Sequence, residues 1–161
     1  MGRKSDISAG LLVYRNPGNV EVLLAHPGGP YWARKDAGAW TIPKGLAEPG
    51  DELLATAQRE FTEETGFVAH GPFLPLAPVK QKSGKVVHAF ATQGDFDPDR
   101  LVSNTFELTW PPRSGRLKSF PEVDRLGWFA HTEAFDKLLV YQQPFLIELK
   151  ELLARREALT P

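Results

Sequence analysis

A glycine-containing loop that leads straight into a helix constrains the fold of this chain more than any other feature. The loop reads PKGLAEPGD, and the pattern after it becomes helical, with Leu54, Ala57 and Phe61 spaced along one face. Gly66 stands where the helix is expected to end, because glycine readily adopts the left-handed conformation of a C-cap. We therefore predict a helix over residues 51–65 that packs its apolar stripe on the rest of the fold.

Glu60, Glu63 and Glu64 fall on one flank of this helix, within an arc of about 100° at helical spacing. Like charges at these spacings repel one another, and acidic groups near a helix C-terminus oppose its dipole. The cluster is therefore either an ordinary solvated helix face or a site for a hard divalent cation, which takes oxygen ligands. Arg59 adjoins Glu60 and could orient its carboxylate.

The spacing between loop and helix favours the cation site. Five residues separate Gly45 from Asp51, and seven more separate Asp51 from the run REFTEETGF. This pattern resembles the Nudix box, G-x5-E-x7-R-E-U-x-E-E-x-G-U, in which U is a bulky apolar residue. Asp51 stands where the family usually has glutamate, and Glu52 follows it directly. This resemblance over residues 45–67 implies an α/β fold, the Nudix-like α/β/α sandwich with a mixed β-sheet. It also implies a hydrolase that cleaves a pyrophosphate bond.

The resemblance further implies a role for each residue of the motif. Glu60 and Glu64 would be the principal ligands of Mg²⁺, with Mn²⁺ as an alternative. Glu63 would ligate a further ion or its bound water, and the Gly45 carbonyl would complete a coordination shell. Arg59 would hold the glutamates in register.

The general base is left open, because the family draws it either from the box or from a loop outside it. Glu60 and Glu64 are the candidates within the motif. Outside it the candidates are Glu122 and Glu107, and the alternative for each is an ordinary surface glutamate.

The run WTIPKGLAEPGD is similar to the tryptophan-to-PKG run of the Nudix branch that cleaves dinucleoside polyphosphates such as diadenosine tetraphosphate. Related runs occur in hydrolases of oxidised nucleoside triphosphates and of diphosphoinositol phosphates, and some Nudix-like proteins are non-catalytic nucleotide sensors. We favour the dinucleoside polyphosphate hydrolase and keep the others as alternatives. The uninterrupted set of Arg59, Glu60, Glu63 and Glu64 favours an enzyme over a sensor.

Substrate-binding candidates lie in the loop just before this run. Tyr31 and Trp32 could stack on a base, whereas Arg34 and Lys35 could meet a polyphosphate. Lys44, next to the loop glycine, supplies a point charge for phosphate.

A second basic group, Arg113, Arg116 and Lys118, lies in the segment 109–124, which we expect to be a loop that reaches over the site. A chain of four phosphates needs more cationic groups than the motif supplies, and this cluster could provide them. The alternative is a solvated loop without a role in binding.

Composition limits the remaining possibilities. The chain has 161 residues, which fits a single Nudix domain over 1–161, and a net charge of -1, which provides no overall field for nucleic acid or a membrane. It has no cysteine, and its four histidines show no zinc-ligand spacing. Because there is also no long apolar run, we expect a cytoplasmic protein that acts on a nucleoside polyphosphate without a nucleic-acid or membrane partner. The oligomeric state is left open.

Patterning predicts an order of strands, helix, strands and helices. Hairpins are expected around residues 16–19 and 82–85, and Trp40 and Trp128 are expected in the core. The C-terminal helix carries an apolar stripe that we expect to pack on its own sheet. The expected strands are 7–15, 20–26, 39–43, 75–81, 85–96 and 127–130, and the later helices are 132–140 and 144–158.

Overall fold

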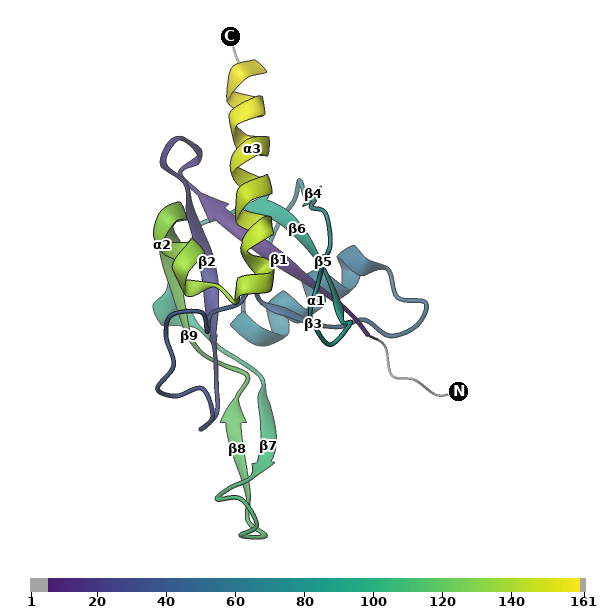
Figure 1. Cartoon of the computed structure of the whole chain (residues 1–161), viewed down its shortest axis with the longest axis vertical. Helices are drawn as coiled ribbons and strands as arrows, with labels where there is room; N and C mark the ends of the chain where they lie inside the picture. The colour runs from purple at the N-terminus through teal and green to yellow at the C-terminus, as the bar shows by residue number, and fades with distance from the viewer. Residues whose placement is uncertain (1–5, 160–161) are drawn as a thin grey trace.

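The architecture is a mixed β-sheet between helices, in a computed structural model that describes residues 6–159 (Figure 1). The strands of the main sheet are β1 (Ile7–Arg15), β2 (Glu21–Pro27), β3 (Lys44–Leu46), β4 (Leu74–Pro75), β5 (Val79–Lys80), β6 (Val86–Gln93) and β9 (Val123–Ala130). Their order is β4-β6-β1-β2-β9, with β3 on β1 and β5 on β6. β1 runs parallel to β6 and antiparallel to β2. The predicted mixed sheet is confirmed.

The central strand β1 has apolar side chains buried on both faces of the sheet. Successive side chains of a strand point to opposite faces. Leu12 and Tyr14 accordingly belong to one buried cluster, and Leu11 and Val13 belong to another. A strand covered on both faces reads as a continuous apolar run, which is what SAGLLVY shows.

Helix α1 (Leu53–Thr65) covers one of these faces and begins two residues later than predicted. Ala57 and Phe61 are fully buried in the cluster that contains Leu11. Gly66 ends the helix at φ 82°, and its N–H donates to the Thr62 carbonyl, as a left-handed C-cap requires.

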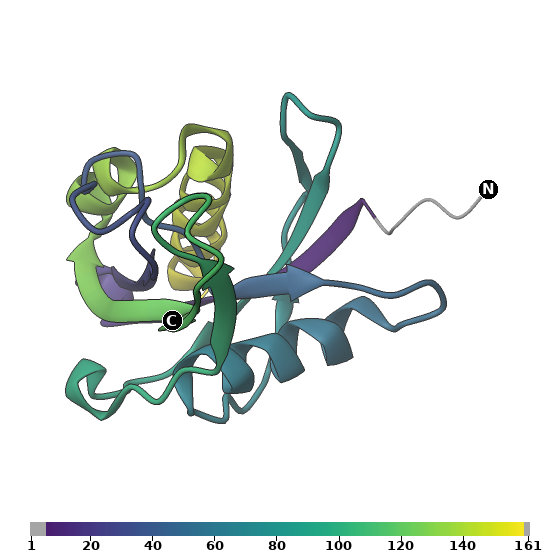
Figure 2. The same ribbon diagram turned by 90° about the horizontal axis from the view of Figure 1, so that it is seen from below.

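The opposite face is covered by α2 (His131–Lys137) and α3 (Gln143–Leu159). Figure 2 shows these helices on one side of the sheet and α1 on the other, which confirms the α/β/α sandwich. Phe145, Leu146 and Leu149 are fully buried there, so α3 packs on its own sheet as expected. Short 3-10 turns occupy η1 (Pro17–Asn19), η2 (Pro98–Arg100) and η3 (Val140–Gln142). Within residues 6–159, no helix combines the length and apolarity needed to cross a bilayer.

The predicted strand at 39–43 is wrong. Trp40 and Thr41 form only isolated bridges, to Leu138 on one side and to Ala25 on the other. Pro43 has no N–H to donate to a ladder, so regular pairing with β1 begins only after it, in β3. Trp40 itself is buried in the core, as predicted.

The segment 109–124 is also not the loop that was predicted. β7 (Thr105–Thr109) and β8 (Leu117–Pro121) form a two-stranded hairpin that extends away from the main sheet (Figure 1). Arg113 and Gly115 turn the chain at its tip with positive φ angles of 65° and 73°. We call this hairpin, with its tip, the β7–β8 arm.

The buried face of α3 provides a test of the packing. We expect Leu149→Ala to lower the free energy of unfolding by about 2–5 kcal/mol, because a fully buried leucine leaves a cavity. Ile147→Ala on the same helix, where the side chain is 49% exposed, should cost less than about 1 kcal/mol. Urea denaturation measures both values, and equal losses would contradict packing of α3 on this sheet.

Candidate functional site

The site is built where the C-terminal half of α1 meets β3. Glu60 lies against the backbone of Gly45, and a Cβ at position 45 would overlap its carboxylate. Only glycine therefore allows this approach. The Glu60 side chain is 17% exposed, whereas the Glu63 side chain is 45% exposed on the outer flank of the helix.

The Arg59 guanidinium lies close to three acidic side chains of the motif. Its guanidinium nitrogens lie 3.7 Å from a Glu60 carboxylate oxygen, 4.0 Å from Glu63 and 3.9 Å from Asp51. Asp51 also accepts a hydrogen bond of 3.0 Å from the Glu48 N–H, which closes the loop before the helix. The shorter acid at this position thus both stabilises the loop and contacts Arg59.

A series of backbone hydrogen bonds places Glu122 beside the C-terminal half of α1. The Asn104 N–H donates to the Glu63 carbonyl at 2.8 Å, and the Glu122 N–H donates to the Asn104 carbonyl at 2.9 Å. The Gly28 N–H in turn donates to the Glu122 carbonyl at 2.9 Å. Three segments far apart in sequence are therefore aligned on the end of α1.

The electrostatics of the site reflect the burial of carboxyl groups close to one another. Burial and the neighbouring Glu60 carboxylate raise the pKa of Glu64 to about 8, although Lys44 opposes the shift. Burial, together with Glu63, raises the pKa of Glu60 to about 7, against the effect of Arg59. Burial also raises the pKa of Glu122 above its ordinary value. Each of these carboxyl groups therefore ionises less readily in the folded protein than it does in water.

This donor set fits a divalent cation. Glu60, Glu63, Glu64 and the Gly45 carbonyl offer hard oxygen ligands, and a cation would offset the burial and the mutual repulsion that raise the pKa values of Glu60 and Glu64. Among the described residues, no three acidic or histidine side chains already converge as a metal cage. Arg59 lies between Glu60 and Glu63 and draws both toward itself, so side-chain rotation would accompany binding.

Two adjoining hollows form one groove over the site. The acidic hollow, of about 470 Å³, is lined by Lys44, Gly45, Leu46, Glu48, Arg59, Glu60, Glu64, Asn104 and Glu122. The second, of about 300 Å³, is lined by Pro27, Trp32, Thr41, Ile42, Lys44, Glu64, Gln81, Glu122, Val123, Leu139 and Tyr141. We call the first hollow the acidic end of the groove and the second, which contains Trp32 and Tyr141, its aromatic end. Lys44, Glu64 and Glu122 line both hollows and therefore lie at the junction of the two ends.

The structure adds lining residues that the sequence did not indicate. Tyr141 comes from η3 and Gln81 from the turn before β6, while Asn104 precedes β7. No spacing in the sequence connects these positions to the motif, because only the pairing of the strands brings them to it.

The predicted binding residues divide into two groups. Lys44 and Trp32 line the groove, whereas Tyr31 lies edge-on to Trp110 of the β7–β8 arm at 5.3 Å. Arg34 is exposed, and the Lys35 ammonium lies 4.9 Å from the centre of the Trp32 ring.

The arm carries the remaining candidates. Arg113, Arg116 and Lys118 are exposed on the β7–β8 arm and line neither hollow of the groove. Glu107, the other candidate base, is exposed in β7 and also lines neither hollow. Of the two outside glutamates, only Glu122 is brought to the carboxylates of α1.

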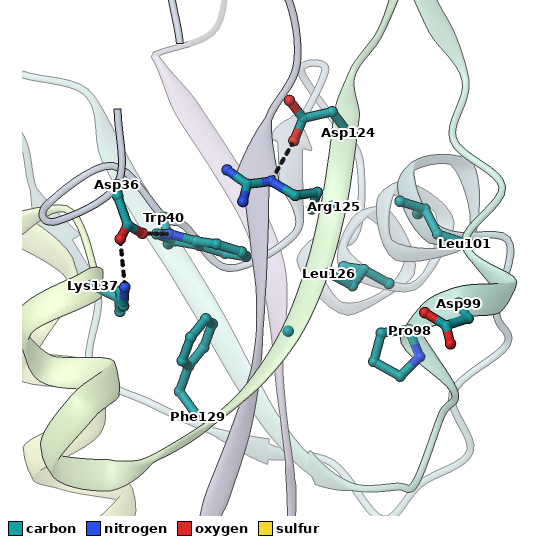
Figure 3. Close-up of a pocket in the computed structure, with 11 residues that line it drawn as sticks. Asp36, Trp40, Pro98, Asp99, Leu101, Asp124, Arg125, Leu126, Phe129 and Lys137 are labelled. Atoms are coloured by element: carbon teal, nitrogen blue, oxygen red, sulfur yellow. Dashed lines mark hydrogen bonds and ion pairs between the residues drawn. The ribbon is translucent and has the colours of Figure 1, made fainter. Parts of the chain in front are cut away.

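A larger hollow of about 690 Å³ lies elsewhere, along β9 and η2 (Figure 3). Asp36, Trp40, Asp124, Arg125 and Lys137 are among its lining residues, and none of the motif glutamates is. Its charges are largely paired within it, with Lys137 at 2.7 Å from Asp36 and Arg125 at 3.7 Å from Asp124. It is therefore separate from the candidate site.

Known structures share this architecture. A C. elegans Ap4A hydrolase in a binary complex superposes with a TM-score of 0.55 at 21% identity, over 94% of this chain and 96% of that one. At this level of identity the likeness establishes the fold alone.

Curated relatives match only in short segments. An ADP-ribose pyrophosphatase, mitochondrial, from Rattus norvegicus is 55% identical over 31 residues, which is 19% of this chain and 9% of that protein. An RNA pyrophosphohydrolase from Caulobacter vibrioides is 42% identical over 53 residues, 30% of this chain and 31% of that protein. The chain thus spans less than a third of the length of each of these relatives.

The family model of the NUDIX domain matches residues 4–149, nearly the whole chain. The match includes the loop, the helix and the groove residues described above. The predicted resemblance is confirmed, and the chain belongs to the NUDIX family.

Proposed function

We propose that this protein is a Mg²⁺-dependent pyrophosphohydrolase of nucleoside polyphosphates, with a dinucleoside polyphosphate such as diadenosine tetraphosphate as the favoured substrate. The observation that carries the proposal is the two-ended groove. Its acidic end offers ligands for a cation that binds phosphates, and its aromatic end offers Trp32 and Tyr141 to a planar base. Lys44 at the junction suits a phosphate between the two ends.

The residues of the groove suit hydrolysis as well as binding. Bound Mg²⁺ would neutralise phosphate oxygens and make a water molecule more acidic. Glu122 faces the acidic end without a cationic partner in an ion pair of its own among the described residues, so its carboxylate is our candidate to accept the proton of the attacking water. Arg59 would hold Glu60 and Glu63 in place as ligands.

A nucleoside triphosphate is the second candidate substrate. The basic residues proposed for a longer phosphate chain lie on the β7–β8 arm, whereas the groove itself contains Lys44 and Arg59. This distribution of charge favours a shorter phosphate chain unless the substrate extends along the arm. A diphosphoinositol phosphate fits least well, because the aromatic end offers it few cationic partners.

The glutamates of α1 provide the direct test of catalysis. We expect Glu64→Gln to lower kcat at least about 100-fold in assays of phosphate release with Mg²⁺, since loss of a ligand removes several kcal/mol of transition-state stabilisation. Glu133→Gln, on α2 and away from the groove, is the matched control and should be unchanged. Equal, measurable turnover of wild type and Glu64→Gln would contradict Glu64 as a catalytic ligand. Binding of a nucleotide by wild type without turnover would instead support the non-catalytic sensor.

A second test uses the coupling between protons and the cation. The raised pKa values, about 8 for Glu64 and about 7 for Glu60, exceed the ordinary value of 4.5, so the folded metal-free protein binds more protons than the unfolded chain. Its stability should therefore fall as the pH rises through this range. Mg²⁺ favours the ionised carboxylates and should raise Tm by several degrees more at about pH 8.5 than at about pH 6.

Differential scanning fluorimetry with and without Mg²⁺ measures this difference. Glu64→Gln should reduce it, because the introduced amide neither titrates nor provides an anionic ligand. An Mg²⁺ shift that is the same at both pH values would contradict the assignment of these carboxyls as ligands.

A substrate panel with identification of the products tests the substrate class. The panel comprises diadenosine tetraphosphate, nucleoside triphosphates, ADP-ribose, a diphosphoinositol phosphate and a 5′-triphosphorylated RNA. We expect diadenosine tetraphosphate to give the highest kcat/KM, and Trp32→Ala to raise its KM about tenfold through loss of base stacking. If diadenosine tetraphosphate is among the slowest substrates, the favoured substrate is wrong.

A further inference from the structure

His26 is a fully buried polar residue that the proposed reaction does not use. It lies near the end of β2, next to the loop 27–38 that carries Trp32. Its Nδ1 is 2.7 Å from a carboxylate oxygen of Asp124, and its Nε2 is 2.7 Å from the carbonyl oxygen of Lys35. Its ring packs edge-on against Trp40 at 5.1 Å.

The strand that supplies Asp124 is irregular at this point. His26 pairs with Arg125 and Pro27 pairs with Val123, so Asp124 is an extra residue in β9. Such a bulge redirects a side chain, here toward the imidazole of His26. The carboxylate is therefore placed against His26 by the register of the sheet and not by flexible loop packing.

Both ring nitrogens of His26 face acceptors. A carbonyl oxygen can only accept, and an ionised carboxylate can only accept, so both short bonds form together when each ring nitrogen carries a hydrogen. The charged groups around His26 and Asp124 are Arg125, whose Nε is 3.7 Å from Asp124, and beyond Trp40 the bonded pair of Lys137 and Asp36.

These contacts anchor the loop on both sides of Trp32. On one side, the Gly28 N–H donates to the Glu122 carbonyl, and a Cβ at position 28 would overlap the Pro121 carbonyl. On the other side, His26 holds the Lys35 carbonyl.

The next residue of the loop is anchored as well. Asp36 accepts hydrogen bonds from the Trp40 indole N–H at 2.8 Å and from Lys137 at 2.7 Å (Figure 3). Between these anchors the side chains of Arg34 and Lys35 are exposed, and Tyr31 contacts Trp110 of the β7–β8 arm. The hydrogen bonds at the two ends of the loop fix where it begins and ends beside the groove.

We propose that His26 is a positioning residue, which through its paired contacts with Asp124 and the Lys35 carbonyl holds the loop 27–38 so that Trp32 faces the aromatic end of the groove. The expected kinetic effect of His26 rests on the proposed function, whereas its effect on the position of the loop does not. His26 touches neither hollow of the groove and acts only through the loop. It should therefore affect the binding of the base and not the bond that is cleaved.

The first experiment needs no substrate. Trypsin needs a backbone that is locally released at the bond it cleaves. The amide of His26→Gln can place a donor at only one of the two acceptors that the imidazole contacts, so this variant should increase cleavage after Lys35 at least about tenfold, as followed by mass spectrometry. His131→Gln is the matched control, because the Nε2 of His131 also contacts a carbonyl, that of Leu146 at 2.9 Å, away from the groove. Unchanged cleavage after Lys35 in His26→Gln would overturn the proposal, whatever the protein hydrolyses.

The second experiment separates positioning from general stability. With diadenosine tetraphosphate, His26→Gln should raise KM about tenfold and change kcat less than about threefold. The double variant His26→Gln with Asp124→Asn should recover most of both effects, because the two amides can donate in series to the Lys35 carbonyl without a charge. A fall in kcat at unchanged KM, or a folded double variant that recovers neither property, would overturn the proposal.

Two safeguards keep the outcomes distinct. Circular dichroism establishes that each variant is folded. If His26→Gln does not fold, Asp124→Ala, whose side chain is 30% exposed, replaces it and should also increase cleavage after Lys35. If wild type does not turn over diadenosine tetraphosphate, the favoured substrate is wrong, and the proteolysis result still decides the role of His26.

Discussion

The close approach of helix α1 to strand β3 at Gly45 is the contact on which the site depends. Phe61 and Ala57 pack helix α1 against the sheet, and the missing Cβ at position 45 lets the Glu60 carboxylate lie against the β3 backbone. Burial of the apolar stripe therefore forces carboxylates on the neighbouring flank into a partly dehydrated position. The raised pKa values of Glu60 and Glu64 are the electrostatic consequence of this packing.

A network of contacts surrounds this end of the helix. Arg59 contacts Asp51, Glu60 and Glu63, and Asn104 satisfies the Glu63 carbonyl. Several carboxyl groups are thus gathered near a single guanidinium, and their oxygens are of the kind that a hard divalent cation binds.

The groove joins two kinds of surface that come from different layers of the fold. Its acidic end belongs to α1 and β3, while its aromatic end is contributed by the loop 27–38 and by η3, which leads into α3. The segment after β8 connects the two ends, because Glu122 bonds to Asn104 on one side and to Gly28 on the other. The arrangement of the two ends of the groove is therefore a property of backbone pairing as much as of side chains.

The sequence alone determined the loop, the helix and the shared flank of its glutamates, because those features depend on residues three to seven positions apart. The central strands and the buried faces of α1 and α3 were predictable from apolar periodicity for the same reason. Only the tertiary structure decided that Glu122 and not Glu107 meets the motif, that Tyr141 and Gln81 line the groove, and that the basic cluster lies on an arm. These contacts join segments many tens of residues apart, and strand register, which local patterns do not specify, sets them.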